Sequence, residues 1–417
     1  MSTKIAIVGA GIGGLSAALS LRRLPNVDIQ IFERADALRE VGASIALGPN
    51  GLRSLEEIGA SNALSDEIGF RSDHGFPMVY RHWMTGEVLV RDMHSPEVRD
   101  RRYFTTRFYR PHLLEALAES VPSGTIHLGK RVIDAVVKSH GATLYFYDGT
   151  QYEADLVVAA DGINSTIRST YLPDFKLHFT GQIWLRTAFD ASLLGDILDD
   201  PKVKNSVHVV GEERSFFSSM LGRGKFTLVG SSYVDLENSP FKDKHWDEEV
   251  DVSIFRDSYK SWHPKVYALA SRAPSMRVFP GWASDTVPTP TYAGRIVLLG
   301  DSFHPHGGAF AVGGSLAIDD GIALYLALRH VQSDPSQSFT AAQLARALEL
   351  YAATRVPHAA RVAQLVETSR ARASKPSQFW DEKRIRDWAA AKKEVVWLHE
   401  HNVHRAFERV LQKLEPT

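Results

Sequence analysis

Two kinds of residue in this chain could bind and position a reactive cofactor: glycines that leave main-chain N–H groups bare, and acids that follow apolar strands. The first glycine cluster is Gly9-Ala10-Gly11-Ile12-Gly13-Gly14. It follows the apolar segment 4–8 and precedes a Leu- and Ala-rich run, and a second apolar segment ends at Glu33. This order of strand, G-x-G-x-x-G, helix, strand and acid is the fingerprint of a dinucleotide-binding βαβ unit.

Each residue of the fingerprint has a physical task. Gly9 allows a tight turn, Gly11 lets a pyrophosphate approach the backbone, and Gly14 lets the helix pack closely on the sheet. The start of the helix offers N–H groups and a partial positive charge to the phosphates. Glu33 stands at the spacing expected of a ribose hydroxyl acceptor. Arg34, which follows it, either bonds the adenosine or lies in solvent.

Two further acids follow buried-type strands. Asp161 and Gly162 end the apolar run 154–160, and Gly300 and Asp301 end a second apolar run. In an open α/β sheet, ligands bind beyond the carboxyl ends of the strands, so both acids are candidate ligand contacts. Asp161-Gly162 could instead be an ordinary turn.

The loop after Asp301 carries four glycines between 307 and 314 and then begins a helix. The bare nitrogens around Gly313 and Gly314 could face a second electron-rich group, and Asp301 could bond a ribityl or ribose hydroxyl. His304 and His306 could be a metal pair, but with no Cys and no obvious acidic third ligand we expect no metal. The other reading of this segment is a polar loop whose groups are all satisfied.

Segments whose residue pattern is typical of βα units alternate with segments whose pattern is typical of antiparallel strands. This alternation predicts an α/β fold: a doubly wound parallel sheet with an inserted antiparallel or mixed β-sheet domain and C-terminal helices. The predicted units are a discontinuous cofactor domain (1–71, 107–174 and 286–335), a substrate-binding β-sheet domain (72–106 and 175–285) and a C-terminal helical region (336–417).

Composition further limits the kinds of partner and chemistry that this protein can have. The chain has 417 residues, a formal net charge of −1 and no cysteine. The near-zero charge disfavours nucleic acid as a partner, and the absence of cysteine excludes disulfides and a thiol nucleophile. We also expect no membrane span, since no apolar run reaches 18 residues, and a cytoplasmic location. The sequence leaves a monomer and a homodimer equally open.

The three motifs, in this order and at this spacing, resemble those of the group A FAD-dependent aromatic hydroxylases, the family of para-hydroxybenzoate and salicylate hydroxylases. Other stretches agree with the resemblance: Pro49-Asn50, and Gly181-Gln182-Ile183-Trp184-Leu185-Arg186, which is similar to a G-x-x-x-W-R strand. The usual loop is close to G-D-A-x-H-x-x-x-P-x-x-G-x-G. Here Gly308 stands in place of the later Pro and Ala311 in place of a Gly, as in fungal salicylate-hydroxylase-like proteins.

The resemblance implies FAD as cofactor, with NADH or NADPH as co-substrate. It also implies insertion of one oxygen atom from O₂ into a phenolic or related aromatic substrate through a C4a-hydroperoxyflavin. It adds Arg110 to the FAD contacts, and makes Arg186 the candidate for the substrate anion. Tyr233 could donate to the substrate, and one of His304 and His306 could assist proton transfer. Each of these residues also has a purely structural reading, such as an ion pair for Arg186 and core packing for Tyr233.

Two other functions remain open from the sequence. The same fold could serve as a flavin-dependent reductase, dehydrogenase or halogenase that inserts no oxygen, although the W-x-W-x-I-P motif of tryptophan halogenases is not found. A nonenzymatic FAD-binding protein is the third possibility. The retention of both the Asp161 and the Asp301 motifs argues against it.

Overall fold

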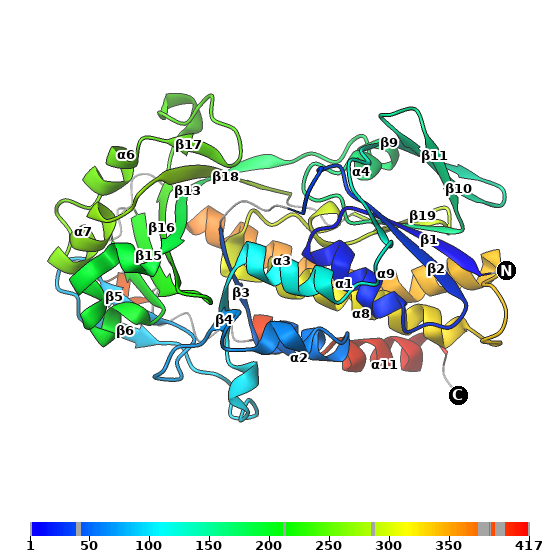
Figure 1. Ribbon diagram of the computed structural model, residues 1–417, viewed down its shortest axis with the longest axis horizontal. Coiled ribbons are helices and arrows are strands. Elements are labelled where there is room, and N and C mark those ends of the chain that lie inside the picture. Colours follow the sequence, from blue (N-terminus) through cyan, green and yellow to red (C-terminus); the bar gives the residue numbers. More distant parts are fainter. Residues whose placement is uncertain are drawn as a thin grey trace.

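The computed structural model describes residues 2–38, 43–211, 214–284, 288–373, 383, 385–387 and 397–415. The chain forms two main bodies, seen side by side in Figure 1, one built around a largely parallel sheet and the other around a large mixed sheet. The predicted α/β fold is therefore confirmed. Parts of the predicted C-terminal helical region, namely residues 374–382, 384, 388–396 and 416–417, lie outside the described residues.

The central sheet is parallel except at one edge, where β19 pairs antiparallel with β20. The strand order places β1 between β12 and β2, so the first two motifs of the sequence lie on neighbouring strands. In order, the strands are β19 (Thr291–Tyr292), β20 (Ile296–Leu298), β12 (Leu156–Ala159), β1 (Thr3–Val8), β2 (Val27–Phe32) and β8 (Ile126–His127).

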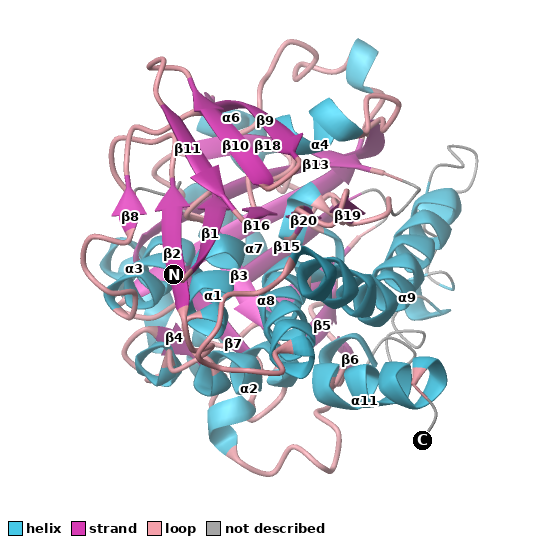
Figure 2. Cartoon of the chain, turned by 90° about the vertical axis from the view of Figure 1, so that its right-hand side faces the viewer, coloured by secondary structure: helices cyan, strands magenta, loops and turns pink. Residues whose placement is uncertain are grey.

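Alternation along β1 sets the layers of this body, because successive side chains of a strand point to opposite faces. Ile5 and Ile7 pack among the residues of α1, α3 and α8. Ala6 and Val8 pack against the residues of a small antiparallel sheet on the other face. Figure 2 shows α8, α9 and α11 gathered on one side of β1 and β2.

The helices and the small sheets of this body have the following bounds. The helices are α1 (Ile12–Leu21), α2 (Pro49–Glu57), α3 (Arg110–Glu119), α4 (Thr166–Tyr171), α8 (Gly313–Val331), α9 (Ala341–Ala373) and α11 (Val403–Leu414). The covering sheet is β11 (Gln151–Ala154), β10 (Gly141–Phe146) and β9 (Val132–Lys138), and a third sheet is β3 (Ser44–Leu47), β7 (Thr106–Tyr109) and β4 (Gly69–Phe70).

The second body is the large mixed sheet, and it joins both predicted β-rich segments. β5 and β6, from the earlier segment, extend the sheet because β5 pairs in parallel with β14. Its strands are, in order, β17 (Glu248–Val250), β18 (Met276–Ala283), β13 (His178–Asp190), β16 (Lys225–Tyr233), β15 (Arg214–Met220), β14 (Val207–Val210), β5 (Val79–His82) and β6 (Val88–Arg91).

The two faces of the large sheet have different partners. Ile183 and Leu185 belong to a core shared with α6 (Val252–Asp257) and α7 (Pro264–Ser271), which lie on the outer side in Figure 1. α5 (Pro201–Lys204) contacts β15 of the same sheet. Trp184 and Arg186 alternate with these core residues and therefore face the other way, toward the first body. Among the helices of the described residues, none combines the length and hydropathy that a membrane crossing needs.

One helix start departs from the usual capping preference. Asparagine favours the N-cap position, but α2 begins at Pro49 with Gly48 as its N-cap, one residue ahead of Asn50. Asn50 is buried inside the first turn, and its amide donates to Asp319 of α8 at 3.5 Å. Proline at the first helical position needs no N–H partner, which explains the earlier start.

Candidate active site

The glycines of the first motif meet their steric tasks. A Cβ on Gly9 would stand 2.4 Å from the carbonyl oxygen of Ala160, and one on Gly14 would stand 1.9 Å from the carbonyl oxygen of Gly9. Gly9 also has a φ of +100°, a region that L-residues rarely adopt. At Gly11 no atom lies within 4 Å of an added Cβ. The backbone is therefore tightly packed at Gly9 and Gly14, whereas free space remains beside Gly11.

Gly11 is also the N-cap of α1, and no side chain caps this helix start. A helix start with unsatisfied N–H groups and open space beside it fits the phosphates of a dinucleotide. Glu33 closes the other side of the loop, because its carboxylate accepts from Ala10 N at 2.8 Å and from Ala35 N at 2.9 Å. Arg34 is exposed, so its side chain does not contribute to the closed part of the loop.

A buried arginine joins the second and third motifs. Arg168, at the start of α4, donates from Nη1 to the carbonyl oxygens of Asp301 and Ser302, both at 3.1 Å. Its Nη2 donates to the carbonyl oxygen of Ile163. The segments after Asp161 and after Gly300 are therefore held side by side, beyond the ends of neighbouring strands β12 and β20. The role of Arg168 was not anticipated, although it stands in the segment that follows Asp161.

The two acids of these motifs differ in exposure. Asp161 is largely buried, and its carboxylate accepts from Ile167 N at 3.3 Å while Oδ1 has no partner within the described residues. Burial raises the pKa of Asp161. Asp301 is exposed, so its carboxylate is accessible to a ligand. The first acid therefore shapes the loop around Gly162, and the second faces outward from the end of β20.

The loop from 306 to 314 lies where the two bodies meet. His306 forms an isolated antiparallel bridge with Ala283 of the large sheet, and Ser284 N donates to the carbonyl oxygen of Pro305 at 3.1 Å. An added Cβ on Gly308 would lie 3.4 Å from Nη2 of Arg186. Gly313 and Gly314 form the first turn of α8, with Gly314 packed against Ile45 and Leu47 of β3.

Arg186 is a half-buried cation in aromatic surroundings. Its guanidinium carbon lies 5.3 Å from the ring centres of both Trp184 and Phe279. Burial, with a smaller contribution from nearby Arg110, lowers the pKa of Arg186 to about 10. Within the described residues no carboxylate pairs with it, and its Nε atom is buried without a hydrogen-bond partner. A half-buried guanidinium whose Nε is buried without a partner is costly, so the site favours an anionic ligand.

Two further residues of the predicted site, Arg110 and Tyr233, lie on other elements than Arg186. Arg110 is the first residue of α3, and its N–H donates to the carbonyl oxygen of Ala43 at 2.9 Å. Tyr233 is the last residue of β16 and is 39% exposed; it pairs with Gln182, one alternation before Trp184. Its ring is therefore at the sheet end rather than beside Arg186.

The two histidines of the loop have unlike surroundings. His304 Nε2 pairs with Asp320 Oδ2 at 2.7 Å, and Asp320 Oδ1 accepts from Arg355 Nε at 2.7 Å. Burial alone raises the pKa of Asp320, but His304 and Arg355 outweigh it and hold that pKa well below its ordinary range. His306 is equally buried, yet neither of its ring nitrogens has a hydrogen-bond partner in the described part of the chain.

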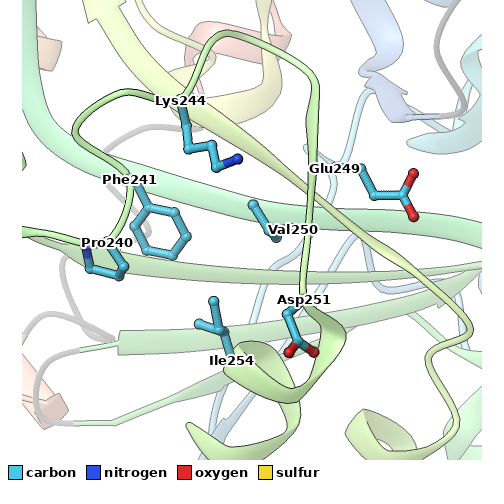
Figure 3. A pocket seen from close by; sticks show the side chains of 7 residues that line it. All are labelled: Pro240, Phe241, Lys244, Glu249, Val250, Asp251 and Ile254. Carbon is cyan, nitrogen blue, oxygen red and sulfur yellow. The ribbon is translucent and has the colours of Figure 1, made fainter.

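A separate hollow of about 390 Å³ lies on the large sheet's outer side, between Phe241 and α6. Figure 3 shows the side chains of Phe241, Val250 and Ile254 in it, with Lys244 and Asp251 at its margins. None of the residues predicted to bind cofactor or substrate lines this hollow. The site described above is therefore distinct from it.

Two curated hydroxylases and one solved structure are similar to this chain over most of its length. The 6-hydroxynicotinate 3-monooxygenase of Pseudomonas fluorescens is 28% identical over 373 residues, which cover 87% of this chain and 90% of that protein. The salicylate hydroxylase of Pseudomonas putida is 29% identical over 384 residues, covering 87% and 84%. A salicylate hydroxylase substrate complex superposes with a TM-score of 0.79 at 20% identity and covers 100% of this chain and 99% of the other.

The model of one protein family, described as "FAD binding domain", matches residues 2–366, which include all three motifs. Its match extends from the start of β1 into α9, across both bodies of the molecule. The chain therefore belongs to the FAD binding domain family.

Proposed function

We propose that this protein is an FAD- and NAD(P)H-dependent monooxygenase that inserts one oxygen atom from O₂ into a small hydroxylated aromatic acid. The observation that carries the substrate class is Arg186. It is a half-buried cation with a buried Nε atom and no carboxylate partner in the described residues, placed between two aromatic rings and beside the loop where the two bodies meet. An aromatic acid supplies both the missing anion and a flat apolar surface.

The residues present fit FAD, since the open space at Gly11 and the uncapped start of α1 suit a pyrophosphate. We assign the cofactor contacts to the three motifs and to two arginines, with Asp161 and Arg34 as the more peripheral members. The proposed set is Gly9, Gly11, Gly14, Glu33, Arg34, Arg110, Asp161, Asp301, Gly313 and Gly314. When bound, FAD takes a hydride from NAD(P)H and, once reduced, activates O₂.

The side chains around the substrate orient it and shield it from water. Arg186 holds the anionic group, and its charge favours the phenolate form of a ring hydroxyl, because a nearby cation lowers the pKa of an acid. Trp184 and Phe279 cover the guanidinium and leave an apolar surface for the ring. Tyr233 contributes from the end of β16, where its hydroxyl can donate to the far end of a substrate. His306 is the proton-transferring candidate, since His304 is committed to Asp320.

The overall reaction balances without a nucleophile from the protein. An aromatic C–H, O₂, NAD(P)H and one proton give an aromatic C–OH, NAD(P)⁺ and water. The relatives support this assignment through their names, because salicylate and 6-hydroxynicotinate are both hydroxylated aromatic acids. The rival function, flavin oxidoreduction without oxygen insertion, has no feature of the site in its favour.

The test is a substrate screen with the FAD-loaded protein. NAD(P)H oxidation is followed with hydroxylated aromatic acids and with the same rings lacking the carboxylate, and products are identified by mass spectrometry. We expect acids to accelerate NAD(P)H oxidation and to gain the mass of one oxygen atom. Equal response to rings with and without a carboxylate would remove the role of Arg186. Oxidation of NAD(P)H with no oxygenated product from any acid would contradict the function.

A further inference from the structure

Two imidazoles of the 300–314 loop lie close together, and some of their ring nitrogens have no hydrogen-bond partner in the described residues. The rings of His304 and His306 are stacked at a centroid distance of 6.4 Å, with an interplanar angle of 16°. Both side chains are buried, at 5% and 6% residue exposure. In the described part of the chain, His304 Nδ1 and both nitrogens of His306 have no hydrogen-bond partner. Three buried polar atoms without partners are costly and call for an explanation.

A small cavity lies against the same two rings. It measures about 10 Å³ and is bordered by Ser284, His304, Pro305 and His306 together with apolar residues of α8 and α9. This volume is enough for a single water molecule, provided that the site offers polar partners. The leftover nitrogens of the two histidines supply them. The centroid distance is also too long for a direct hydrogen bond and suits one intervening molecule.

The charges around the pair determine its protonation. Burial lowers the pKa of His306, and neighbouring His304 lowers it further, whereas Asp301 raises it. His358 of α9 is neutral for the same reason, because burial and then Arg355 lower its pKa to about 2. The charged and titratable groups that face the pair from its own loop and from β13, α8, α9 and the segment before α11 are Asp301, Arg186, Asp320, Arg355, His358 and His401.

We propose that the cavity holds one ordered water molecule that joins His304 Nδ1 to His306, and that this water-linked pair takes up one proton from solvent when FAD is reduced. The inference rests on the proposed FAD site, to which Asp301 and Gly313 belong. His306 is next to both: an added Cβ on Gly313 would lie 3.0 Å from its ring, and the Asp301 carboxylate acts on it electrostatically.

A hydride brings two electrons and one proton to FAD, which leaves the reduced cofactor with one additional negative charge. A buried imidazole beside a new negative charge binds a proton more tightly. The pair therefore gains one proton and compensates that charge. It releases the proton again when O₂ reoxidises the cofactor. Asp320 and Arg355 act as positioning residues, because they fix His304 Nε2 and leave Nδ1 for the water.

The test counts protons at equilibrium and uses no substrate. The midpoint potential of the FAD in the holoenzyme is measured between pH 6 and 8, and its slope with pH gives the protons bound per two electrons. The absorbance of the reduced flavin shows where it is the anion, which alone accounts for one proton. In that range we expect two protons per two electrons for the wild type and one for His306→Gln. His94→Gln, which alters a half-buried histidine stacked on Phe104, should keep two.

Two results would overturn the proposal: a wild-type count of one proton, or a count of two that persists in His306→Gln. If His306→Gln retains no FAD, the wild-type count still decides, together with His304→Gln, which should also bind one proton. A high-resolution crystal structure should show one water between the two rings, and an empty cavity would contradict the link. None of these results depends on hydroxylation, so a failed substrate screen would leave the proton count unchanged.

Discussion

Replacing Ala311 by glycine tests the conformation of the loop that joins the two bodies. Gly307, Gly308, Phe310 and Ala311 all have positive φ, with values of +56° for Phe310 and +53° for Ala311. The left-handed region costs an L-residue roughly 1–2 kcal/mol, a strain from which glycine is free. Such strain persists where the surroundings enforce it, and Phe310 packs against a core cluster that includes Val312 and Leu316.

The expected magnitude follows from three features of Ala311. Its φ is positive, its side chain is exposed, and its Cβ therefore has little packing to lose. Ala311→Gly should relieve about 1–2 kcal/mol of strain and lose roughly 0.5–1 kcal/mol through the greater freedom of the unfolded chain. The net effect is a stabilisation of about 0.5–1 kcal/mol. The same change at Ala360, exposed within α9, should instead destabilise by about 1 kcal/mol.

The assay is urea-induced unfolding of both variants and the wild type, followed by tryptophan fluorescence under identical conditions. The two substitutions are chemically identical, so the opposite signs of their effects isolate the backbone conformation. We expect the midpoint to rise for Ala311→Gly and to fall for Ala360→Gly. A fall of similar size in both would refute the left-handed conformation at Ala311.

Three further outcomes are expected. Gly11→Ala should leave the stability of the FAD-free protein unchanged and weaken FAD binding at least tenfold by equilibrium dialysis, because the added methyl enters the open phosphate space; unchanged affinity would contradict that position. Arg186→Gln should keep FAD and raise KM for an aromatic acid roughly 30-fold, since losing a charged hydrogen bond costs about 2 kcal/mol; unaltered kinetics would eliminate its role. The hydrogen bond to Glu57 raises the pKa of His404. This pair should therefore stabilise α11 fully below about pH 6.5 and progressively less as pH rises through the raised pKa. Hydrogen exchange of α11 should show this trend in the wild type, and the trend should be absent in His404→Gln.

The sequence was most informative where function depends on local geometry. The close packing at Gly9 and Gly14 could be predicted because it concerns the backbone of the βαβ unit, and the open space at Gly11 is consistent with the predicted phosphate contact. Glu33 lies beside this loop because strand, helix and strand in a βαβ unit have nearly fixed lengths, and its predicted contact with a ribose hydroxyl stays a prediction. The residue pattern predicted that the two β-rich segments form one unit, and the parallel pairing of β5 with β14 places strands of both segments in one sheet.

Long-range pairing could not be read in the same way. Nothing local to His304 indicates that Asp320 and Arg355 will occupy one of its nitrogens, since these residues come from two later helices. Arg168 likewise acquires its partners from a loop more than a hundred positions away. Asn50 does not occupy the N-cap that its residue type favours, because Pro49 begins the helix and the Asn50 amide instead donates to Asp319.

The backbone conformation of the 306–314 loop could not be predicted from the sequence either. Ala311 stands where resemblance leads one to expect glycine, and the change by itself suggests an altered backbone. The structure instead keeps the left-handed conformation with an L-residue. Whether a position tolerates such strain depends on its surroundings, here the packing of Phe310 and Val312, which no single position reveals.

The fate of the oxygen atoms tests the central claim most directly. FAD-loaded protein, NAD(P)H and an accepted hydroxylated aromatic acid are incubated under ¹⁸O₂ in unlabelled water, and the product is analysed by mass spectrometry. One ¹⁸O atom per molecule of aromatic product is expected. An oxidised product without the label would show that the flavin removes electrons from its substrate without transferring oxygen.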